Sequence, residues 1–287
     1  MVEIKLRKIR SKLDLLKGLK KDVVIKKERG ENILIVGATG SGKLSLMLMV
    51  LDSLLINPLR SIMINALNEE WIYESWLLIQ ERRLGRKVSS FDFIKFNLTE
   101  KFEVSEYKKV NFKSKIVQDV INKPTYLGIN NMLHSEKANS KLLYRFLKNL
   151  PINYGDEIPI FISELSYTVS LNSKFVKEIV KSINNKGYFF VFCGQDFFKI
   201  PQDIYKFCVH KIIMKTEYIQ KDILGLMSNN ISTTLRGLHT SEYCYFKDWC
   251  VMEGKVKMDV DIPKKTEELP VPIAIRQLML KSNILGF

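Results

Sequence analysis

The 287-residue sequence lacks any run of about 18 uncharged apolar residues, the length that a helix needs to cross a bilayer. The segment after Met1 is charged and lacks the apolar stretch of a secretory signal. Histidine and cysteine are scarce, with three and four residues, and their spacing matches no metal-binding motif. We therefore expect a cytoplasmic chain with no transmembrane segment, whose cysteines are small buried side chains in a reducing compartment.

What is present is an ordinary globular composition with a strong excess of positive charge. The chain is 46% hydrophobic and 26% charged, and its formal charge is +14. Residues 1–30 contain eleven lysines and arginines against four acids, and this net +7 is half of the total. The segment is interpreted either as a basic extension that contacts phosphates or as a solubilising, lysine-rich composition.

Glycines gather in the stretch Gly37–Lys43, which reads GATGSGK and fits the pattern G-x-x-x-x-G-K. An apolar run, residues 32–36, predicts a strand before it, and the apolar residues 44–55 predict a buried helix after it. This context favours a phosphate-binding loop over an ordinary glycine-rich turn, because backbone N–H groups and a helix N-terminus then face the ligand. The predicted nucleotide-binding residues are Gly37, Ala38, Thr39, Gly40, Ser41, Gly42, Lys43, Leu44 and Ser45.

One position departs from the pattern. The residue after the lysine normally carries a hydroxyl that holds Mg²⁺, and here it is Leu44, with Ser45 one place later. Since a helix turns about 100° per residue, Ser45 does not simply take its neighbour's place. The sequence predicts either a local change of register, with Ser45 as the metal ligand, or weaker magnesium binding.

Two later apolar runs end in polar residues. IPIFISE, residues 158–164, resembles the Walker B strand of nucleoside triphosphatases, with Ser163 at the usual aspartate position and Glu164 at that of the catalytic glutamate. YFFVFCGQ, residues 188–195, ends in Gln195. Because ligands bind beyond the carboxyl ends of parallel strands, Lys43, Glu164 and Gln195 are predicted to face one crevice. The alternatives are a buried strand with a carboxylate at its end and an amide that caps a strand.

Alternating strand and helix patterns predict an α/β fold, a doubly wound and mostly parallel sheet with helices on both faces. Residues 85–115 are interpreted as an edge strand or an insertion, residues 114–122 as a short helix and residues 242–246 as the last strand. The domain boundaries are a basic N-terminal extension over 1–30, a P-loop ATPase core over 31–252 and a C-terminal tail over 253–287. Further helices are expected over residues 11–19, 218–226 and 273–280.

The order of these motifs resembles the HerA–FtsK superfamily of DNA-pumping ATPases over roughly residues 30–250. The stretch DFFKIPQDIYKFCVHKI after Gln195 and the later GLMSNNISTTLRGLHTSEYCYF extend the resemblance. It implies a RecA-like P-loop fold, ATP and Mg²⁺ as cofactors, double-stranded DNA as a partner and a homo-oligomer, expected to be a hexamer. The size suits the small packaging ATPases of viruses, archaeal ones among them, with virion or membrane-associated assembly proteins as further partners and a host-cytoplasmic or virion-associated location.

By the same resemblance, Lys43 binds the β/γ-phosphates, Glu164 polarises water and Gln195 senses the γ-phosphate. An arginine acting in trans at a subunit interface is also implied, with Arg145 and Arg236 as candidates. Leu44 and Ser163 depart from the family pattern. They motivate a second hypothesis, a degenerate P-loop subunit without efficient hydrolysis. A third is a different P-loop enzyme, either an initiator-like ATPase, which would continue into a helical lid domain, or a small-molecule kinase, which needs an arginine-rich lid.

Overall fold

The computed structural model describes thirteen segments of the chain. They are residues 2–6, 23–54, 60–65, 70–98, 102–104, 108–109, 118–129, 136–165, 173–195, 200–216, 237–238, 242–247 and 250–257. The predicted helices over residues 11–19, 218–226 and 273–280 lie outside these segments, and so does Arg236.

The described part of the chain forms one large sheet of eleven strands and a separate two-stranded sheet. Seven neighbouring strands of the large sheet run parallel, which confirms the predicted α/β fold. In spatial order they are β11 (Cys208–Met214), β3 (Asn32–Val36), β10 (Tyr188–Gly194), β9 (Ile158–Ile162), β4 (Ile62–Asn65), β8 (Thr125–Ile129) and β5 (Ile94–Leu98). β10 thus lies between the strand that precedes the glycine-rich loop and the strand that precedes Glu164.

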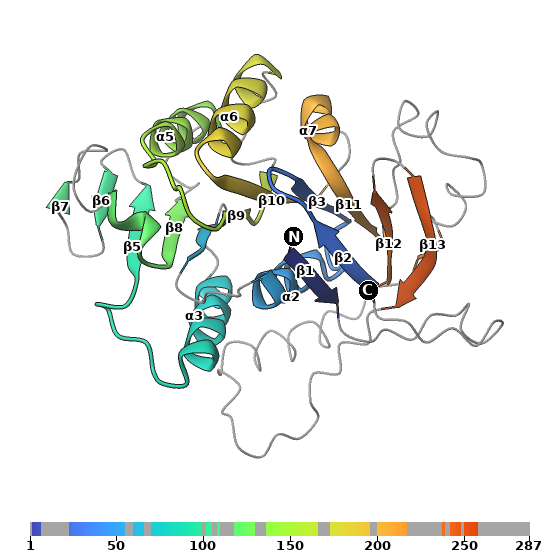
Figure 1. The fold of residues 1–287 in the computed structure, drawn as a ribbon, viewed down its shortest axis with the longest axis horizontal. Helices are drawn as coiled ribbons and strands as arrows, with labels where there is room; N and C mark the ends of the chain where they lie inside the picture. Colours follow the sequence, from blue (N-terminus) through green and yellow to red (C-terminus); the bar gives the residue numbers. More distant parts are fainter. Residues whose placement is uncertain are drawn as a thin grey trace.

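Helices cover both faces of this sheet (Figure 1). In β3, Ile33 and Ile35 belong to an apolar cluster with the helices of one face, whereas Leu34 and Val36 belong to the cluster of the other. Burial on both faces explains why the parallel strands read as continuous apolar runs. The first face carries α2 (Lys43–Leu54) and α3 (Glu70–Leu84), and the second carries α5 (Glu136–Lys148), α6 (Ser173–Asn185) and α7 (Gln202–Phe207).

Antiparallel strands extend the sheet at both ends, and here two predictions need correction. The 85–115 segment contains β5, which pairs with β8 inside the parallel sheet, followed by β6 (Phe102–Val104) and β7 (Lys108–Lys109). At the other end β12 (Glu242–Lys247) is not the last strand, because β13 (Cys250–Lys257) pairs with it. In these segments the side-chain pattern is irregular or polar, but the strands form because pairing satisfies their backbone hydrogen-bonding groups. Residues 118–121 of the predicted 114–122 helix are helical, with a 3₁₀ helix over Asp119–Ile121, and residues 114–117 lie outside the described segments.

The two-stranded sheet is a hairpin of β1 (Val2–Leu6) and β2 (Val23–Lys27) that packs against α2. Ile25 is fully buried in the same apolar cluster as α2, and Lys27 is also buried. The end of the basic N-terminal segment is therefore held against the helix that follows the glycine-rich loop.

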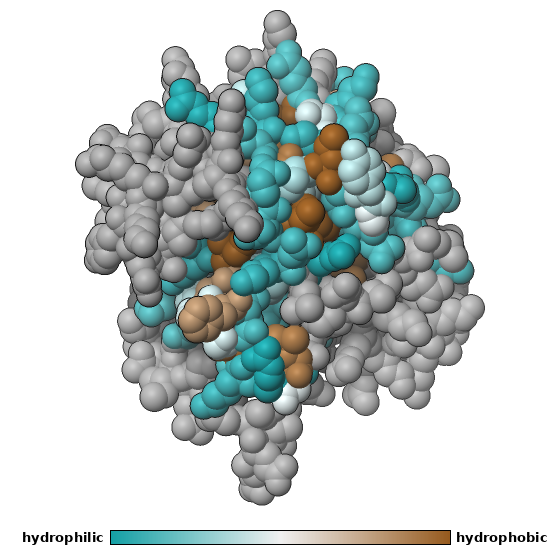
Figure 2. Space-filling view, turned by 60° about the vertical axis from the view of Figure 1, so that its left-hand side comes forward, coloured by the Kyte–Doolittle hydropathy of each residue, from teal (hydrophilic) through white to brown (hydrophobic). Residues whose placement is uncertain are grey.

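The surface view in Figure 2 shows small apolar patches separated by hydrophilic side chains. The large apolar side chains exposed in the described segments are Leu78, Phe91, Ile152 and Tyr154. Scattered apolar groups of this kind are usual on protein surfaces. Within the described segments, no helix has the length and apolar character needed to span a membrane.

Candidate active site

The glycine-rich loop joins β3 to α2 and is fixed by its own backbone and by two neighbouring strands. Gly40 and Gly42 have φ angles of +75° and +92°, a region that favours glycine. The Gly37 N–H donates to the Gly194 carbonyl at 3.2 Å, and the Ala38 N–H donates to the Lys215 carbonyl at 2.8 Å. The ends of β10 and β11 therefore hold the first two residues of the loop.

Two features inside the loop suit a bound phosphate. A Cβ atom on Gly37 would lie 2.5 Å from Ser41 Oγ and 2.8 Å from Met214 Cβ, so a larger residue does not fit this position. The Ser41 side chain is 1% exposed, and its hydroxyl has no hydrogen-bond partner in the described structure. A buried hydroxyl that the protein leaves unpaired, beside a helix N-terminus, fits an anionic ligand such as a nucleotide phosphate.

The structure brings Lys43, Glu164 and Gln195 together, as their places at the strand ends predicted. Glu164 is 3% exposed, and its Oε1 accepts the Gln195 N–H at 3.0 Å. Its Oε2 lies 4.0 Å from Lys43 Nζ, and the Gln195 amide bonds to the hydroxyl of Thr39 in the loop. One buried carboxylate, one lysine and one amide therefore meet beside the glycine-rich loop.

Leu44 and Ser45 separate in space, as the helical turn requires. Leu44 packs against the apolar cluster of the α2–α3 face, whereas the Ser45 side chain is exposed. Ser163, at the position where an aspartate is usual, is 1% exposed, and its hydroxyl lies 3.4 Å from Asn65 Oδ1. The metal role of Ser45 stays a prediction. Among the described residues, no group of three or more His, Cys, Asp or Glu side chains is placed to hold a metal ion.

Sequence reasoning missed two features of this site. Asn65 ends β4 next to Ser163, and Lys215 follows β11 and accepts the Ala38 N–H through its carbonyl. Asn65 was detectable in principle, since it ends a predicted strand with a polar residue. Lys215 acts through its backbone, which side-chain patterns do not reveal. Arg145 is exposed on α5, and its suggested role in trans stays a prediction.

Cys193 of β10 lies beneath this site and is fully buried. Burial raises the pKa of its thiol far above the usual range, and the nearby Glu164 carboxylate adds to this rise, whereas Lys43 opposes it. The thiol is therefore protonated and neutral, and its role is to fill space in the core. Cys208 and Cys244 are buried and unbridged as well, as the sequence predicted for the cysteines.

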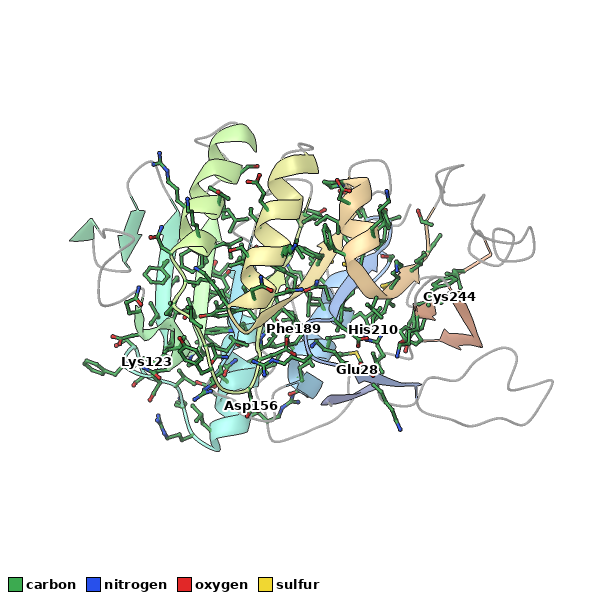
Figure 3. The ribbon with its side chains drawn as sticks, turned by 45° about the horizontal axis from the view of Figure 1, so that its top comes forward. Glu28, Lys123, Asp156, Phe189, His210 and Cys244 are labelled. Atoms are coloured by element: carbon green, nitrogen blue, oxygen red, sulfur yellow. The ribbon has the colours of Figure 1, made fainter. Side chains whose placement is uncertain are left out.

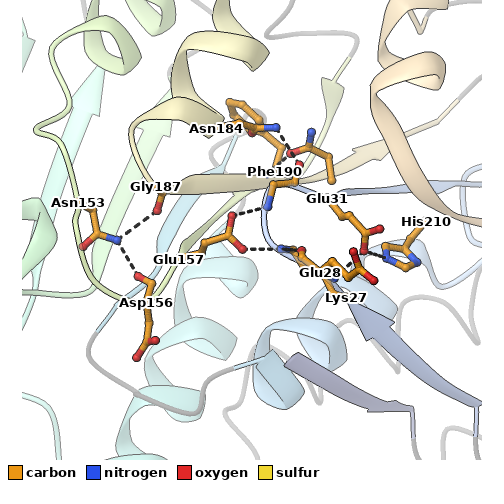
Figure 4. Close-up of polar contacts among 12 residues, drawn as sticks. Lys27, Glu28, Glu31, Asn153, Asp156, Glu157, Asn184, Gly187, Phe190 and His210 are labelled. Atoms are coloured by element: carbon orange, nitrogen blue, oxygen red, sulfur yellow. Dashed lines mark hydrogen bonds and ion pairs between the residues drawn. The ribbon is translucent and has the colours of Figure 1, made fainter. Parts of the chain in front are cut away.

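The opposite edge of the sheet is held by a separate polar network. Lys123, Asp156 and Glu28, which precede β8, β9 and β3, lie along this edge (Figure 3). Lys27 Nζ lies 2.8 Å from Glu157 Oε2, and Glu157 Oε1 accepts the Gly30 N–H at 2.7 Å (Figure 4). Burial lowers the pKa of Lys27, although Glu157 opposes this shift. The network thus fixes the β2–β3 connection at the edge away from the loop.

No family model matches the chain, and a search of curated proteins finds no match either. Among solved structures, the fold is similar to that of the genome packaging NTPase B204 from Sulfolobus turreted icosahedral virus 2, in complex with AMPPCP. The identity is 15%, the match covers 80% of this chain and 98% of that one, and the TM-score is 0.52. VirB4 of Thermoanaerobacter pseudethanolicus matches with 11% identity over 90% of this chain and 96% of that one, with a TM-score of 0.56. At these identities the likeness is one of fold, and at that level it confirms the predicted resemblance.

Proposed function

We propose that this chain, which has the RecA-like fold of P-loop ATPases, binds and hydrolyses ATP and uses the energy to move double-stranded DNA. The observation that carries the ATPase part is the meeting of Lys43, Glu164 and Gln195 beside a loop whose buried Ser41 hydroxyl lacks a protein partner. The positive charge of +14 and the fold likeness to a genome packaging NTPase support DNA as the partner.

Each residue then has a role set by its position. Lys43 neutralises the β- and γ-phosphates, while the loop N–H groups other than those of Gly37, Ala38 and Ser41 surround them. Glu164 takes a proton from water as the water oxygen bonds to the γ-phosphorus and the bond to the β–γ bridging oxygen breaks. Gln195 bonds to Thr39 of the loop and its N–H donates to Glu164, and these contacts support a role in sensing the γ-phosphate.

Magnesium is the expected second cofactor, and it would neutralise charge on the phosphate oxygens when bound. Among the described residues, the side-chain oxygens in or next to the loop include the hydroxyls of Ser41, Ser45 and Ser163 and the carboxylate of Glu164. With Leu44 packed into the apolar cluster, the usual hydroxyl position is lost. We infer that the metal depends mainly on the nucleotide's own oxygens, which predicts weaker magnesium binding than in a typical P-loop ATPase.

The same departures at Leu44 and Ser163 favour a second candidate, a nucleotide-binding assembly subunit without efficient hydrolysis. The initiator-like alternative has less support, because the described residues after β11 extend the sheet with two antiparallel strands, β12 and β13. In either of the first two cases we infer a homo-oligomer, with a hexamer as the working hypothesis for the motor.

The test is steady-state ATP hydrolysis with magnesium, with and without duplex DNA. We expect DNA-stimulated turnover, loss of nucleotide binding in Lys43→Ala, and a fall in kcat of about a hundredfold or more in Glu164→Gln. Lys123→Ala, at the opposite edge of the sheet, is the matched control and should leave turnover unchanged. Tight nucleotide binding without turnover would contradict the ATPase proposal and support the assembly subunit. Turnover without a DNA effect would contradict the motor.

A further inference from the structure

Three buried polar side chains lie together beside the candidate active site, on neighbouring strands. Asn65 ends β4 and is 0% exposed, and Ser163 follows β9 and is 1% exposed. Tyr126 of β8 is also 1% exposed. Buried polar groups need hydrogen bonds to offset the loss of water, so their arrangement is constrained.

These side chains form a hydrogen-bonded chain in which the asparagine is the centre. Asn65 Nδ2 donates to the Tyr126 hydroxyl at 2.6 Å, and the Ser163 hydroxyl lies 3.4 Å from Asn65 Oδ1. An asparagine has a donor and an acceptor on one rigid amide, so the bond to Tyr126 turns the oxygen toward Ser163. A leucine of similar size could form neither hydrogen bond.

The far end of the chain is held by aromatic packing. The Tyr126 ring packs edge-on against Tyr73 of α3 with a centroid distance of 4.7 Å, and the ring of Trp76 lies 5.6 Å away. Tyr126 is therefore a fixed support for the asparagine, because its ring position depends on the packing of α3 and not on the loop.

The near end of the chain reaches the residue before Glu164. The Ser163 N–H donates to the Ile64 carbonyl at 3.0 Å, so β4 holds Ser163 through its backbone as well as through the Asn65 side chain. Glu164 comes next, and its carboxylate contacts the Gln195 N–H and lies near Lys43. A shift of Ser163 would therefore move the carboxylate away from both groups.

We propose that Asn65 is a positioning residue for ATP hydrolysis, which through Ser163 holds the Glu164 carboxylate at its place between Lys43 and Gln195. This inference rests on the proposed function. Its distinct content is that a side chain on β4, the strand next to the one that leads to Glu164, controls the rate of the chemical step. Tyr126 supports the same role indirectly, because its hydroxyl accepts a hydrogen bond from Asn65.

The experiment compares the full-length wild type with Asn65→Leu and Tyr126→Phe, which removes only the hydroxyl. We expect kcat to fall about 10- to 100-fold in Asn65→Leu, as when groups that orient active-site ligands are removed, and by less in Tyr126→Phe. The KM for ATP should stay unchanged, because the loop and Lys43 still bind the phosphates. Gln80→Leu is the matched control, since Gln80 is a fully buried amide on α3 whose polar atoms have no partner in the described structure.

A second measurement does not depend on turnover. Hydrogen exchange of the Gln195 amide reports its bond to Glu164, so Asn65→Leu should speed this exchange, and Gln80→Leu should not. Unchanged Gln195 exchange, or equal losses of kcat in Asn65→Leu and Gln80→Leu, would overturn the inference. If the wild type shows no turnover, the proposed function fails, and the exchange measurement still decides whether Asn65 holds Glu164.

Discussion

At the scale of single residues, the loop depends on the absence of a side chain at Gly37. Its neighbours Ser41 and Met214 fill the space that a Cβ atom would need, and Gly194 and Lys215 hold the adjoining backbone. Ser41 Oγ, which would lie 2.5 Å from a Cβ atom on Gly37, is also the hydroxyl that has no hydrogen-bond partner in the described structure. A methyl group at Gly37 would therefore displace the side chain that suits a phosphate.

The corresponding prediction concerns Gly37→Ala. We expect nucleotide affinity to fall at least about tenfold, equivalent to about 1.4 kcal/mol, because the loop must shift to admit the methyl group. Isothermal titration with a non-hydrolysable ATP analogue measures this. Gly85→Ala is the control, since Gly85 has a φ of +66° and open space around it. This change should lower stability by about 1–2 kcal/mol without altering nucleotide affinity. Equal nucleotide affinity in Gly37→Ala and the wild type would contradict the prediction.

At the scale of elements, hydrogen bonds from β11 and the residue after it hold the segments at both ends of β3. The Lys215 carbonyl accepts the Ala38 N–H at the loop end, and at the other end His210 Nε2 lies 2.8 Å from Glu31 Oε2. His210 Nδ1 also lies 2.7 Å from the hydroxyl of Tyr245 on β12, and the imidazole is fully buried. One histidine therefore links three segments that pack beside the strand leading to the loop.

The pH dependence of stability follows from this histidine. Burial lowers the pKa of His210 below its ordinary 6.5; Glu31 opposes the shift, and Lys247 and Lys27 add to it. In the unfolded chain His210 takes up its proton at a higher pH than in the folded chain, so the free energy of unfolding should fall as the pH drops below about 6.5. Burial alone would raise the pKa of Glu31, but hydrogen bonds from the Glu28 N–H and His210 hold it lower, which adds a loss at more acidic pH.

Urea unfolding of the wild type and of His210→Gln, at pH values between 7.5 and 5.5 in steps of about half a pH unit, measures how His210 changes the free energy of unfolding. Glutamine keeps hydrogen-bonding groups and does not titrate, so the variant should show a flatter decline on acidification. Parallel pH profiles for the two proteins would show that His210 does not contribute.

At the scale of the whole molecule, the basic N-terminal segment, residues 1–30, combines a strong positive charge with strands that pack against α2. The segment carries half of the net charge, and the described hairpin at its two ends packs against α2, the helix that begins at Lys43. We propose that the basic N-terminal segment contacts DNA phosphates. The lysines of residues 17–21 are the natural ones to test.

Removing Lys17, Lys20 and Lys21 together should weaken binding to duplex DNA and make it less sensitive to salt. Each lost phosphate contact lowers the slope of log K against log salt by about 0.9. Fluorescence anisotropy at several salt concentrations gives these slopes. An equal charge change at the exposed lysines 87, 181 and 206 is the control and should alter the slope less. Identical slopes in both triple variants would show that only overall charge matters.

Much of this protein was predictable because the chemistry involved is local. The glycine-rich loop needs its residues in sequence order, and a strand buried on both faces must be apolar throughout, so both features are visible in residues 32–43. The polar residues that end buried strands, Glu164 and Gln195, were predictable for the same reason, since parallel strands present their carboxyl ends at one edge.

Pairing between distant segments was decided only by the tertiary structure. The placement of β5 within the parallel sheet and the existence of β13 depend on which backbone groups found partners, and side-chain patterns describe that poorly. The same holds for the Tyr126–Asn65–Ser163 chain, because its members are far apart in sequence. The sequence by itself determined that a glycine-rich loop between a strand and a helix, and a strand that leads to an acid, exist. The strand order decided that β10 separates them and that Asn65 lies next to Ser163, since only folding brings the ends of separate strands together.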